Sequence, residues 1–149
     1  MRVVVQRVRE AAVAVGGEEI ARIGRGFLVL AGFGKGDTEA ELAWMARKVA
    51  TLRIFEDETG RMTLPLAAVD GRALVVSQFT LYGDCRKGAR PSFDGSAPPE
   101  EARERYARFC ALLEAELPGG VATGAFQERM AVSLVNDGPV TIVIEREAA

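Results

Sequence analysis

The sequence predicts a single α+β domain over residues 1–149, with a mostly antiparallel, barrel-like β-sheet and two helices packed on it. Roughly seven or eight short segments have the apolar pattern of strands, and two longer segments have that of amphipathic helices. The two kinds do not alternate regularly, as they would in a parallel nucleotide-binding sheet. A chain of 149 residues buries about 70% of its unfolded surface, so this core needs no disulfide or metal.

The first third of the chain predicts a strand, a hairpin and a buried strand. Val3, Val5 and Val8 alternate with polar residues, and Gly16-Gly17 then forms a two-residue turn before a second strand at 20–23. Residues 26–33 (GFLVLAGF) are continuously apolar, which is typical of a strand buried on both faces.

An amphipathic helix is predicted over residues 38–52. Thr38 and Glu41 have the spacing of a capping box, which marks its first turn. Its apolar residues recur at the spacing of one helix face: Leu42, Met45, Val49 and Leu52.

The middle of the chain predicts two strands of different length. Residues 53–55 form a short strand before a polar turn at 56–60, and residues 62–69 are irregular around Pro65. Residues 73–81 (ALVVSQFTL) predict the most deeply buried strand, and 82–99 a loop rich in Gly, Pro, Ser and charge.

The last third predicts a second helix and three strands. Pro98-Pro99 and three acidic residues suit a helix start, an apolar stripe continues to Leu117, and Pro118-Gly119-Gly120 ends the helix. Strands follow at 121–126, 130–135 and 140–145, and Asn136-Asp137-Gly138-Pro139 is expected to turn the last pair.

Composition excludes several classes of protein. The chain has no histidine, so Ser-His-Asp and Cys-His nucleophile systems and His-containing zinc sites cannot form. Its two cysteines, Cys85 and Cys110, are too few for a four-cysteine metal site and fit a reducing compartment. We therefore expect no metal and no cofactor. The net charge of -2 argues against a uniformly basic nucleic-acid-coating surface.

The N-terminus and the apolar runs indicate a cytoplasmic protein without a membrane partner. Arg2 and Arg7 leave no room for the apolar core of a secretory signal. The longest apolar run, at 27–31, is far shorter than the ~20 residues of a membrane span.

Polar side chains end the most buried predicted strand. Ser77, Gln78 and Thr80 stand directly before a glycine-rich loop, a position that often delivers polar groups to the rim of a pocket. The alternative is that Ser77 and Thr80 satisfy backbone groups nearby, and on the pattern alone this is the more frequent case.

Two other segments carry candidate function. The only Asn in the chain is Asn136, and it opens the turn that ends in Gly138-Pro139. That bond is expected to be trans on frequency, since only about 5–6% of X-Pro bonds are cis. Arg86, Lys87 and Arg90 lie in the 82–99 loop, where they either bind phosphates or form an ordinary solvated loop.

These segments together resemble the D-aminoacyl-tRNA deacylases, the D-tyrosyl-tRNA deacylase family, along essentially the whole chain. The resemblance rests on SQFTL at 77–81, on RPSF at 90–93 and on Gly124-x-Phe126. It also rests on the C-terminal run from Met130 through the segment NDGPVT at 136–141, and QRV at 6–8 and RIF at 53–55 fit as well.

The resemblance implies a homodimer that hydrolyses the ester between a D-amino acid, and also glycine, and the 3′-terminal adenosine of tRNA. It implies active sites at the subunit interface, contact with the acceptor end, and a cis Gly-Pro bond. The implied catalytic residues are Ser77, Gln78, Phe79 and Thr80. The residues implied for substrate binding and for a chiral gate that rejects L-amino acids are Gly138, Pro139, Asn136, Arg7, Phe93 and Met130. Arg86, Lys87 and Arg90 are the candidates for RNA binding.

The resemblance further implies that the 2′-hydroxyl of the terminal adenosine activates water while the N–H groups of Phe79 and Thr80 stabilise the oxyanion. A Thr80 nucleophile is the second mechanism, although no base is visible beside it in the sequence. The other function classes are a non-catalytic nucleic-acid-binding module and a hydrolase of free D-amino-acid esters or peptides that has no RNA partner.

Overall fold

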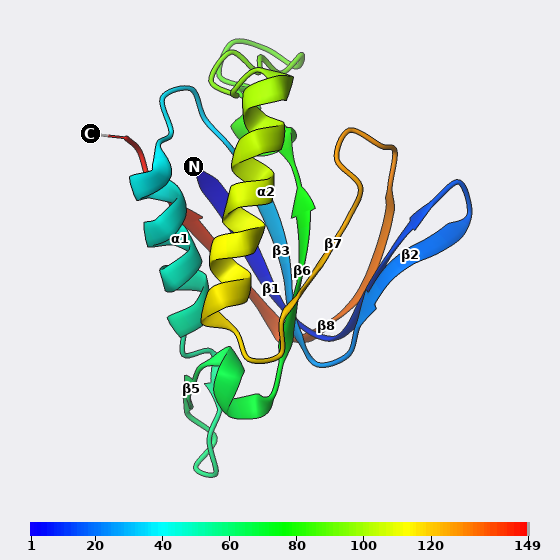
Figure 1. The fold of residues 1–149 in the computed structure, drawn as a ribbon, viewed down its shortest axis with the longest axis vertical. Helices are drawn as coiled ribbons and strands as arrows, with labels where there is room; N and C mark the ends of the chain where they lie inside the picture. The colour runs from blue at the N-terminus through cyan, green and yellow to red at the C-terminus, as the bar shows by residue number, and fades with distance from the viewer. Residues whose placement is uncertain (149) are drawn as a thin grey trace.

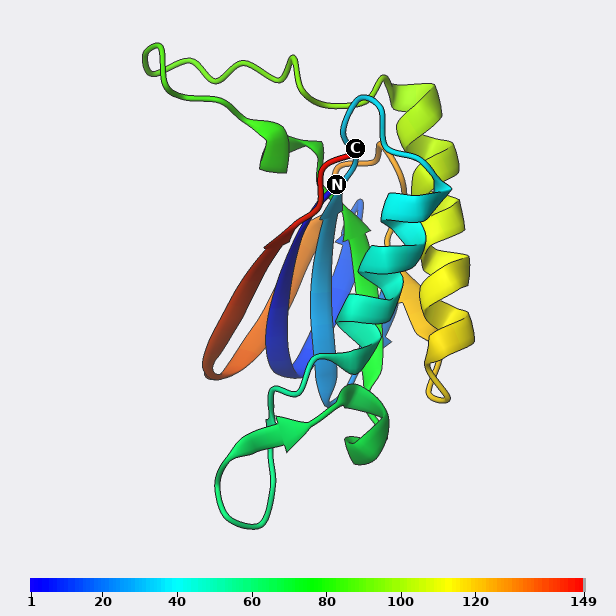
Figure 2. The ribbon, with the colours of Figure 1, turned by 90° about the vertical axis from the view of Figure 1, so that its left-hand side faces the viewer.

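A computed structural model, which describes residues 1–148, has one mixed six-stranded sheet with two helices on one face (Figure 1, Figure 2). The strand order is β2-β1-β3-β6-β7, and β8 pairs with the other edge of β1. The strands are β1 (Arg2–Val15), β2 (Glu18–Ile23), β3 (Gly26–Gly32), β6 (Arg72–Ser77), β7 (Val121–Thr123) and β8 (Ala131–Glu145). The helices are α1 (Glu39–Thr51) and α2 (Pro99–Glu116). The predicted α+β fold with a barrel-like sheet is confirmed.

The long strand β1 organises the sheet. It pairs antiparallel with β3 through its first half, with β2 through its second half and with β8 along nearly all its length. Both β1 and β8 bend sharply near their middles, as Figure 1 and Figure 2 show, so β2 comes to lie against β6 and β7. The sheet therefore curls toward a barrel, while β3, β6 and β7 pair in parallel.

Apolar patterning explains where the core lies. Val3, Val5 and Phe27 are fully buried between the sheet and the helices, together with Phe55 and Phe109. A smaller apolar cluster fills the inside of the curled sheet: Val8, Ala11, Val13, Ile23, Leu28, Leu74 and Val76. Because β3 has a cluster on each side, its continuous apolar run is explained.

Both predicted helices are confirmed. Thr38 caps α1 through its hydroxyl, which accepts from the Ala40 N–H at 3.3 Å, and the Glu41 carboxylate accepts from the Thr38 N–H at 2.6 Å. The hairpin on Gly16-Gly17 is also confirmed, since both glycines have the positive φ that such a turn requires.

The strand predicted over 73–81 is too long. Ser77 pairs with Ala31, but β3 ends one residue later, so the ladder has no further partner. The chain turns at Gln78 into a 3₁₀ helix, η2 (Phe79–Tyr82). The strand predicted over 121–126 is also too long: β7 stops at Thr123, which pairs with Val75, although β6 itself continues to Ser77.

The region between α1 and β6 is more regular than the sequence predicts. Residues 62–64 form β5 (Met62–Leu64), which pairs with β4 (Phe55–Glu56) in a hairpin that projects from the body (Figure 1, Figure 2). The 3₁₀ helix η1 (Leu66–Val69) follows. Pro65 lies between β5 and η1, which explains why the sequence pattern of residues 62–69 is irregular.

The prediction that Asn136–Pro139 turns a hairpin pair is wrong. The segments on either side both pair with β1 and not with each other: Val8 pairs with Asn136, and Gln6 with Thr141. Residues 137–140 are thus an insertion in one long strand opposite Arg7. The insertion lies where β1 and β8 bend together (Figure 2).

No helix in residues 1–148 has the length and apolarity needed to cross a membrane.

Candidate active site

A cavity of about 870 Å³ opens at the end of β6. Its walls come from the β6–η2 junction, the loop before α2, the first turn of α2, and the segment between β7 and β8. The lining residues include Phe33, Lys35, Ser77, Gln78, Phe79, Phe93, Pro99, Phe126, Met130 and Val132. Five of the residues expected at the site, from three separate segments, thus share one cavity: Ser77, Gln78, Phe79, Phe93 and Met130.

The β6–η2 junction presents backbone donors at this cavity. The Gln78 N–H donates a hydrogen bond to the carbonyl oxygen of Ala31 at 2.8 Å. Within residues 1–148 the N–H groups of Phe79 and Thr80 have no hydrogen-bond acceptor, because they open a 3₁₀ turn. Two adjacent unpaired N–H groups are suited to bind a developing oxyanion.

Thr80 itself is not among the residues that line the cavity. Its hydroxyl accepts a hydrogen bond from the Gln78 side-chain amide, and the threonine is exposed. An amide is not a base that could remove the hydroxyl proton.

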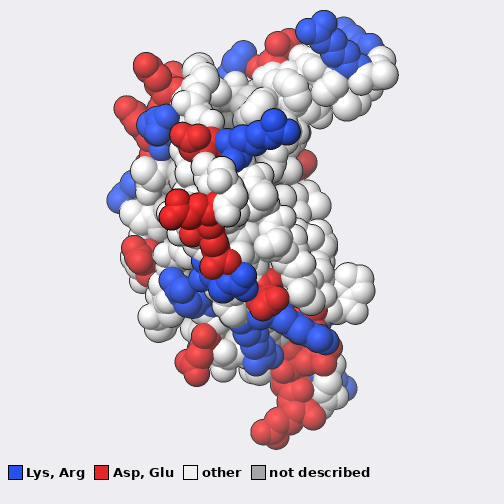
Figure 3. Space-filling view, turned by 90° about the vertical axis from the view of Figure 1, so that its right-hand side faces the viewer, with Lys and Arg blue, Asp and Glu red and all other residues white. Residues whose placement is uncertain are grey.

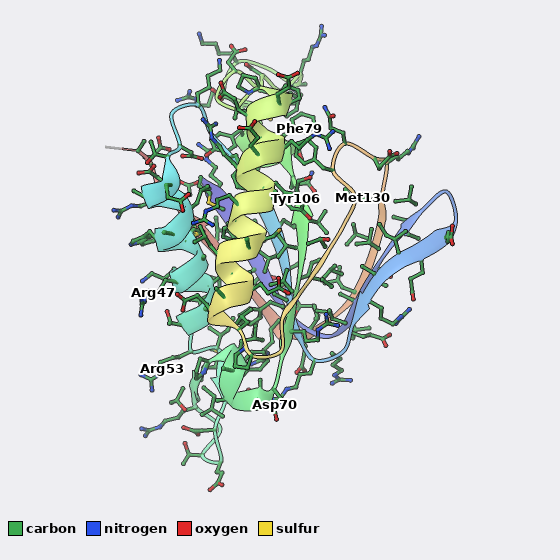
Figure 4. All side chains as sticks on the ribbon, in the orientation of Figure 1. Arg47, Arg53, Asp70, Phe79, Tyr106 and Met130 are labelled. Carbon is green, nitrogen blue, oxygen red and sulfur yellow. The ribbon has the colours of Figure 1, made fainter. Side chains whose placement is uncertain are left out.

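Aromatic and sulfur-containing side chains form the walls. The rings of Phe79 and Phe93 pack edge to face with centroids 5.1 Å apart, although Phe79 is 58% exposed. A Cβ at Gly124 would lie 2.8 Å from the sulfur of Met130, so the glycine makes room for that side chain. Figure 4 labels both Phe79 and Met130, which lie in the upper half of the view.

Sequence reasoning missed Phe126 as part of the wall. This ring lies 5.9 Å from that of Tyr106, and the Arg103 guanidinium stacks on it at 4.8 Å. The Gly124-x-Phe126 motif was the available signal, but a motif does not say which way a ring points.

The two carboxylates that line the cavity, Asp94 and Glu128, have no hydrogen bond to a serine or threonine hydroxyl within residues 1–148. Burial raises the pKa of the Cys110 thiol to about 12, which keeps it protonated, and burial also raises the pKa of Tyr106. The Tyr106 hydroxyl donates to the carbonyl oxygen of Val75 at 2.7 Å. Among the described residues no cluster of His, Cys, Asp or Glu could hold a metal ion.

The inserted loop of β8 lies at the other end of the sheet. Arg7 is only 6% exposed, and it donates to the carbonyl oxygens of Asp137 at 2.8 Å and Ile54 at 2.7 Å. The Gly138-Pro139 bond is cis, as the resemblance implies and contrary to the frequency argument. Gly138 has φ +146°, where a side chain is strained, and a Cβ there would lie 2.8 Å from Val140.

The loop and the cavity of one chain do not meet. Along β3, Arg7 pairs with Phe27 whereas Ser77 pairs with Ala31. Four residues of strand separate these levels, which is roughly 13 Å along the strand direction. Figure 1 shows the bend of β8 at the lower end of the sheet and the end of β6 at its upper end.

The three basic residues predicted to bind RNA lie outside the cavity lining. Arg86 is paired with Asp84 at 2.7 Å, and this hydrogen-bonded guanidinium lowers the pKa of Asp84 to about 2. Lys87 and Arg90 are exposed on the same loop. Figure 3 shows basic side chains at the tip of this projecting loop.

Known proteins resemble the chain over almost its whole length. A family model described as D-Tyr-tRNA(Tyr) deacylase matches residues 4–145. A D-aminoacyl-tRNA deacylase of Chlorobaculum parvum is 57% identical over 145 residues, which are 97% of each chain. One from Geobacter sulfurreducens is 54% identical over 149 residues, covering 99% of this chain and 97% of that protein.

Two solved structures share the fold. The c-Myc DNA Unwinding Element Binding Protein superposes with a TM-score of 0.94 at 43% identity, over 99% of this chain and 100% of that one. A protein described as a probable eukaryotic D-amino acid tRNA deacylase has a TM-score of 0.83 at 19% identity, over 96% of this chain and 97% of its own. At that identity the second likeness concerns the fold alone.

Proposed function

The chain belongs to the D-Tyr-tRNA(Tyr) deacylase family, and from that premise we propose how its site works. It is a hydrolase, a D-aminoacyl-tRNA deacylase. Its substrate is the ester that joins a D-amino acid, or glycine, to the 3′-terminal adenosine of tRNA. The observation that carries the proposal is the pair of unpaired N–H groups, on Phe79 and Thr80, where β6 ends at an apolar cavity.

The reaction is hydrolysis without a protein base. The oxygen of a water molecule bonds to the ester carbonyl carbon, and the carbonyl oxygen takes negative charge between the two N–H groups. The bond to the 3′ oxygen then breaks, and that oxygen takes a proton, giving tRNA and the free amino acid. We infer that the adjacent 2′-hydroxyl of the adenosine activates the water: the chain has no histidine, and within residues 1–148 the cavity carboxylates Asp94 and Glu128 are not hydrogen-bonded to a hydroxyl group.

Two copies of the chain are needed to complete the site. Gly138 and Pro139 are exposed at a loop tip that Arg7 anchors, and the same chain's cavity lies at the far end of the sheet. We place the loop of one subunit in the cavity of the other, in a homodimer with active sites at the interface. Gly138 has no side chain, so its backbone forms the wall of the gate. A backbone has no side-chain rotamers to change, so the side chain of an L-amino acid cannot displace it. Glycine, which has no side chain to exclude, passes the gate.

The RNA contact is proposed on the projecting loop. Lys87 and Arg90 are exposed there, and Arg86 remains free to exchange its Asp84 partner for phosphate. The alternative mechanism, in which Thr80 is a nucleophile, is less favoured because the hydrogen-bond partner of its hydroxyl is the Gln78 amide, which is not a base.

The decisive experiment uses one tRNA charged in parallel with D-tyrosine, L-tyrosine and glycine, and metal-free enzyme. We expect rapid loss of the D-ester, slower loss of the glycyl ester and no loss of the L-ester. A tRNA ending in 2′-deoxyadenosine should react about 10²–10⁴-fold more slowly, the usual contribution of a general base. Equal cleavage of the D- and L-esters would refute the gate, and full activity on the deoxy substrate would refute the role of the 2′-hydroxyl.

A second candidate function is DNA binding without turnover. It is favoured by one observation, the 43% identity to the c-Myc DNA Unwinding Element Binding Protein. If neither ester is cleaved while duplex DNA binds with a steep salt dependence, this function replaces the hydrolase.

A further inference from the structure

The β1–β8 ladder has a gap that a side chain fills. Val8 pairs with Asn136 and Gln6 with Thr141, so residues 137–140 of β8 stand opposite Arg7 alone. Backbone groups in such an insertion lose their ladder partners and need others when they are not fully solvated. Val140, which is partly buried, is the residue at which β8 returns toward the ladder.

The side-chain amide of Asn136 supplies the missing partners. Its Oδ1 accepts from the Val140 N–H at 2.7 Å, and its Nδ2 donates to the Val140 carbonyl oxygen at 3.2 Å. The same Nδ2 lies 3.2 Å from the hydroxyl of Thr141 and donates to it. The amide thus pairs with Val140 as a neighbouring strand's peptide group would.

This arrangement needs an amide. An ionised aspartate has two acceptors and no donor, so it would satisfy the Val140 N–H but repel the Val140 carbonyl oxygen. It would also add a second carboxylate beside Asp137. Alanine would leave both Val140 groups without a partner. The sequence contains one Asn in 149 residues, and it stands at this position.

We propose that Asn136 is a positioning residue for stereospecificity, an inference that rests on the gate proposed above. Arg7 holds the loop at its beginning, through the carbonyl oxygen of Asp137, and Asn136 holds it at its end, through Val140. Gly138 and Pro139 lie between these two points and are exposed. The two hydrogen-bonded residues therefore fix the position of the tip from both sides.

The test compares three variants. Asn136→Asp is nearly isosteric and replaces the donor by a charged oxygen, and Asn136→Ala loses both groups. Thr141→Val removes the third contact but leaves the hydrogen bonds of Asn136 with Val140, the Val140 clamp, intact. At pH 7.5 we expect the ratio of D- to L-tyrosyl-tRNA hydrolysis to fall at least tenfold in both Asn136 variants. The Thr141 variant should stay within threefold of the parent, and sedimentation should find all of them in the parent's oligomeric state.

A pH series separates positioning from a general loss of structure. A protonated carboxyl group has one donor and one acceptor, as an amide does, and an aspartate has an ordinary pKa of about 3.9. Lowering the pH from 7.5 to about 3.5, below this pKa, should therefore raise the D/L ratio of Asn136→Asp toward that of the parent. The ratio of Asn136→Ala should not change in this way.

Hydrogen exchange tests the clamp independently of catalysis. The Val140 amide should exchange slowly in the parent and in Thr141→Val, and at least tenfold faster in Asn136→Ala. Unchanged exchange in that variant, or an unchanged D/L ratio in both Asn136 variants, would overturn the inference. If the parent itself lacks stereospecificity, the proposed gate fails and so does the role of Asn136 in it, while slow Val140 exchange would still show the clamp.

Discussion

The two ends of the sheet differ in the kind of residue that forms them. The cavity end has apolar walls, Phe79, Phe93, Phe126 and Met130, and the polar groups that we propose to act there are backbone N–H groups, although polar side chains such as Ser77 also line it. The loop end is held by polar side chains, the buried Arg7 and Asn136, which bind backbone carbonyl oxygens and an N–H group. The difference teaches that changes at the cavity end should alter rate, whereas changes at the loop end should alter selectivity.

The largest effect is expected for Arg7→Ala. The change leaves the carbonyl oxygens of Asp137 and Ile54 without a charged donor, which should cost about 3 kcal/mol in the free energy of unfolding. It also releases the loop, so the D/L ratio should fall at least tenfold. Urea unfolding and deacylation of both tyrosyl esters measure the two effects.

Arg7→Lys is the matched control for this prediction. Lysine keeps the charge but lacks the planar fork that reaches both oxygens, so its stability and D/L ratio should be intermediate. An Arg7→Ala protein with the parent's D/L ratio would contradict the division of labour between the two ends.

At the cavity end, Gly32→Ala should reduce rate without altering selectivity. A Cβ there would lie 2.9 Å from the Gln78 carbonyl oxygen and 3.2 Å from the Leu81 Cβ, so the β6–η2 junction must shift. We expect about 1–3 kcal/mol of destabilisation, as for other overpacked sites, and about a tenfold or larger loss of D-tyrosyl-tRNA turnover. Gly24→Ala, where a Cβ meets nothing within 4 Å, is the control. A changed D/L ratio in Gly32→Ala would show that the two ends are coupled.

Thr80→Ala should have a smaller effect. It removes a hydroxyl that binds the Gln78 amide but keeps the Thr80 N–H, so turnover should stay within about tenfold of the parent. Single-turnover kinetics with D-tyrosyl-tRNA measure this. A loss of 10³-fold or more, together with a trapped aminoacyl-enzyme in the parent, would establish Thr80 as the nucleophile instead.

The smallest effect is expected in the β4–β5 hairpin, next to the loop end. Hydrogen bonds from Thr59 and Thr63 lower the pKa of Asp57 from 3.8 to about 2. A carboxylate with a lowered folded-state pKa stabilises the fold above its unfolded pKa and loses that contribution as the pH falls through the folded one. The stabilisation should therefore be complete above about pH 4 and decline toward pH 2.

Asp57→Asn should remove this slight acid dependence from thermal unfolding curves, with Glu58→Gln as the control. Neither change should alter the D/L ratio, because Arg7 contacts Glu56 of the hairpin and Ile54 just before it, and not Asp57. A changed D/L ratio in Asp57→Asn would show that the hairpin turn also influences selectivity.

Much of the fold could be predicted from local pattern. The capping box at Thr38, the glycines of the first hairpin and the apolar run at 26–33 each specify a local conformation, and each is found. Strand ends were predicted less well at 73–81 and 121–126, because a strand ends where its pairing ends. The partner is not visible in the local pattern.

The candidate site, too, has features that could be predicted from the sequence and others that could not. The sequence by itself determined the residue types: no histidine, a polar segment after a buried strand, one Asn before Gly138-Pro139, and a family resemblance that the comparisons confirm. The tertiary structure decided their placement. It grouped Phe126 with Phe93 and Met130, kept the 136–140 loop away from that cavity, and made Asn136 the partner of Val140. The physical reason is that side-chain chemistry is a property of each residue, whereas pairing and distance depend on how β1 and β8 bend together.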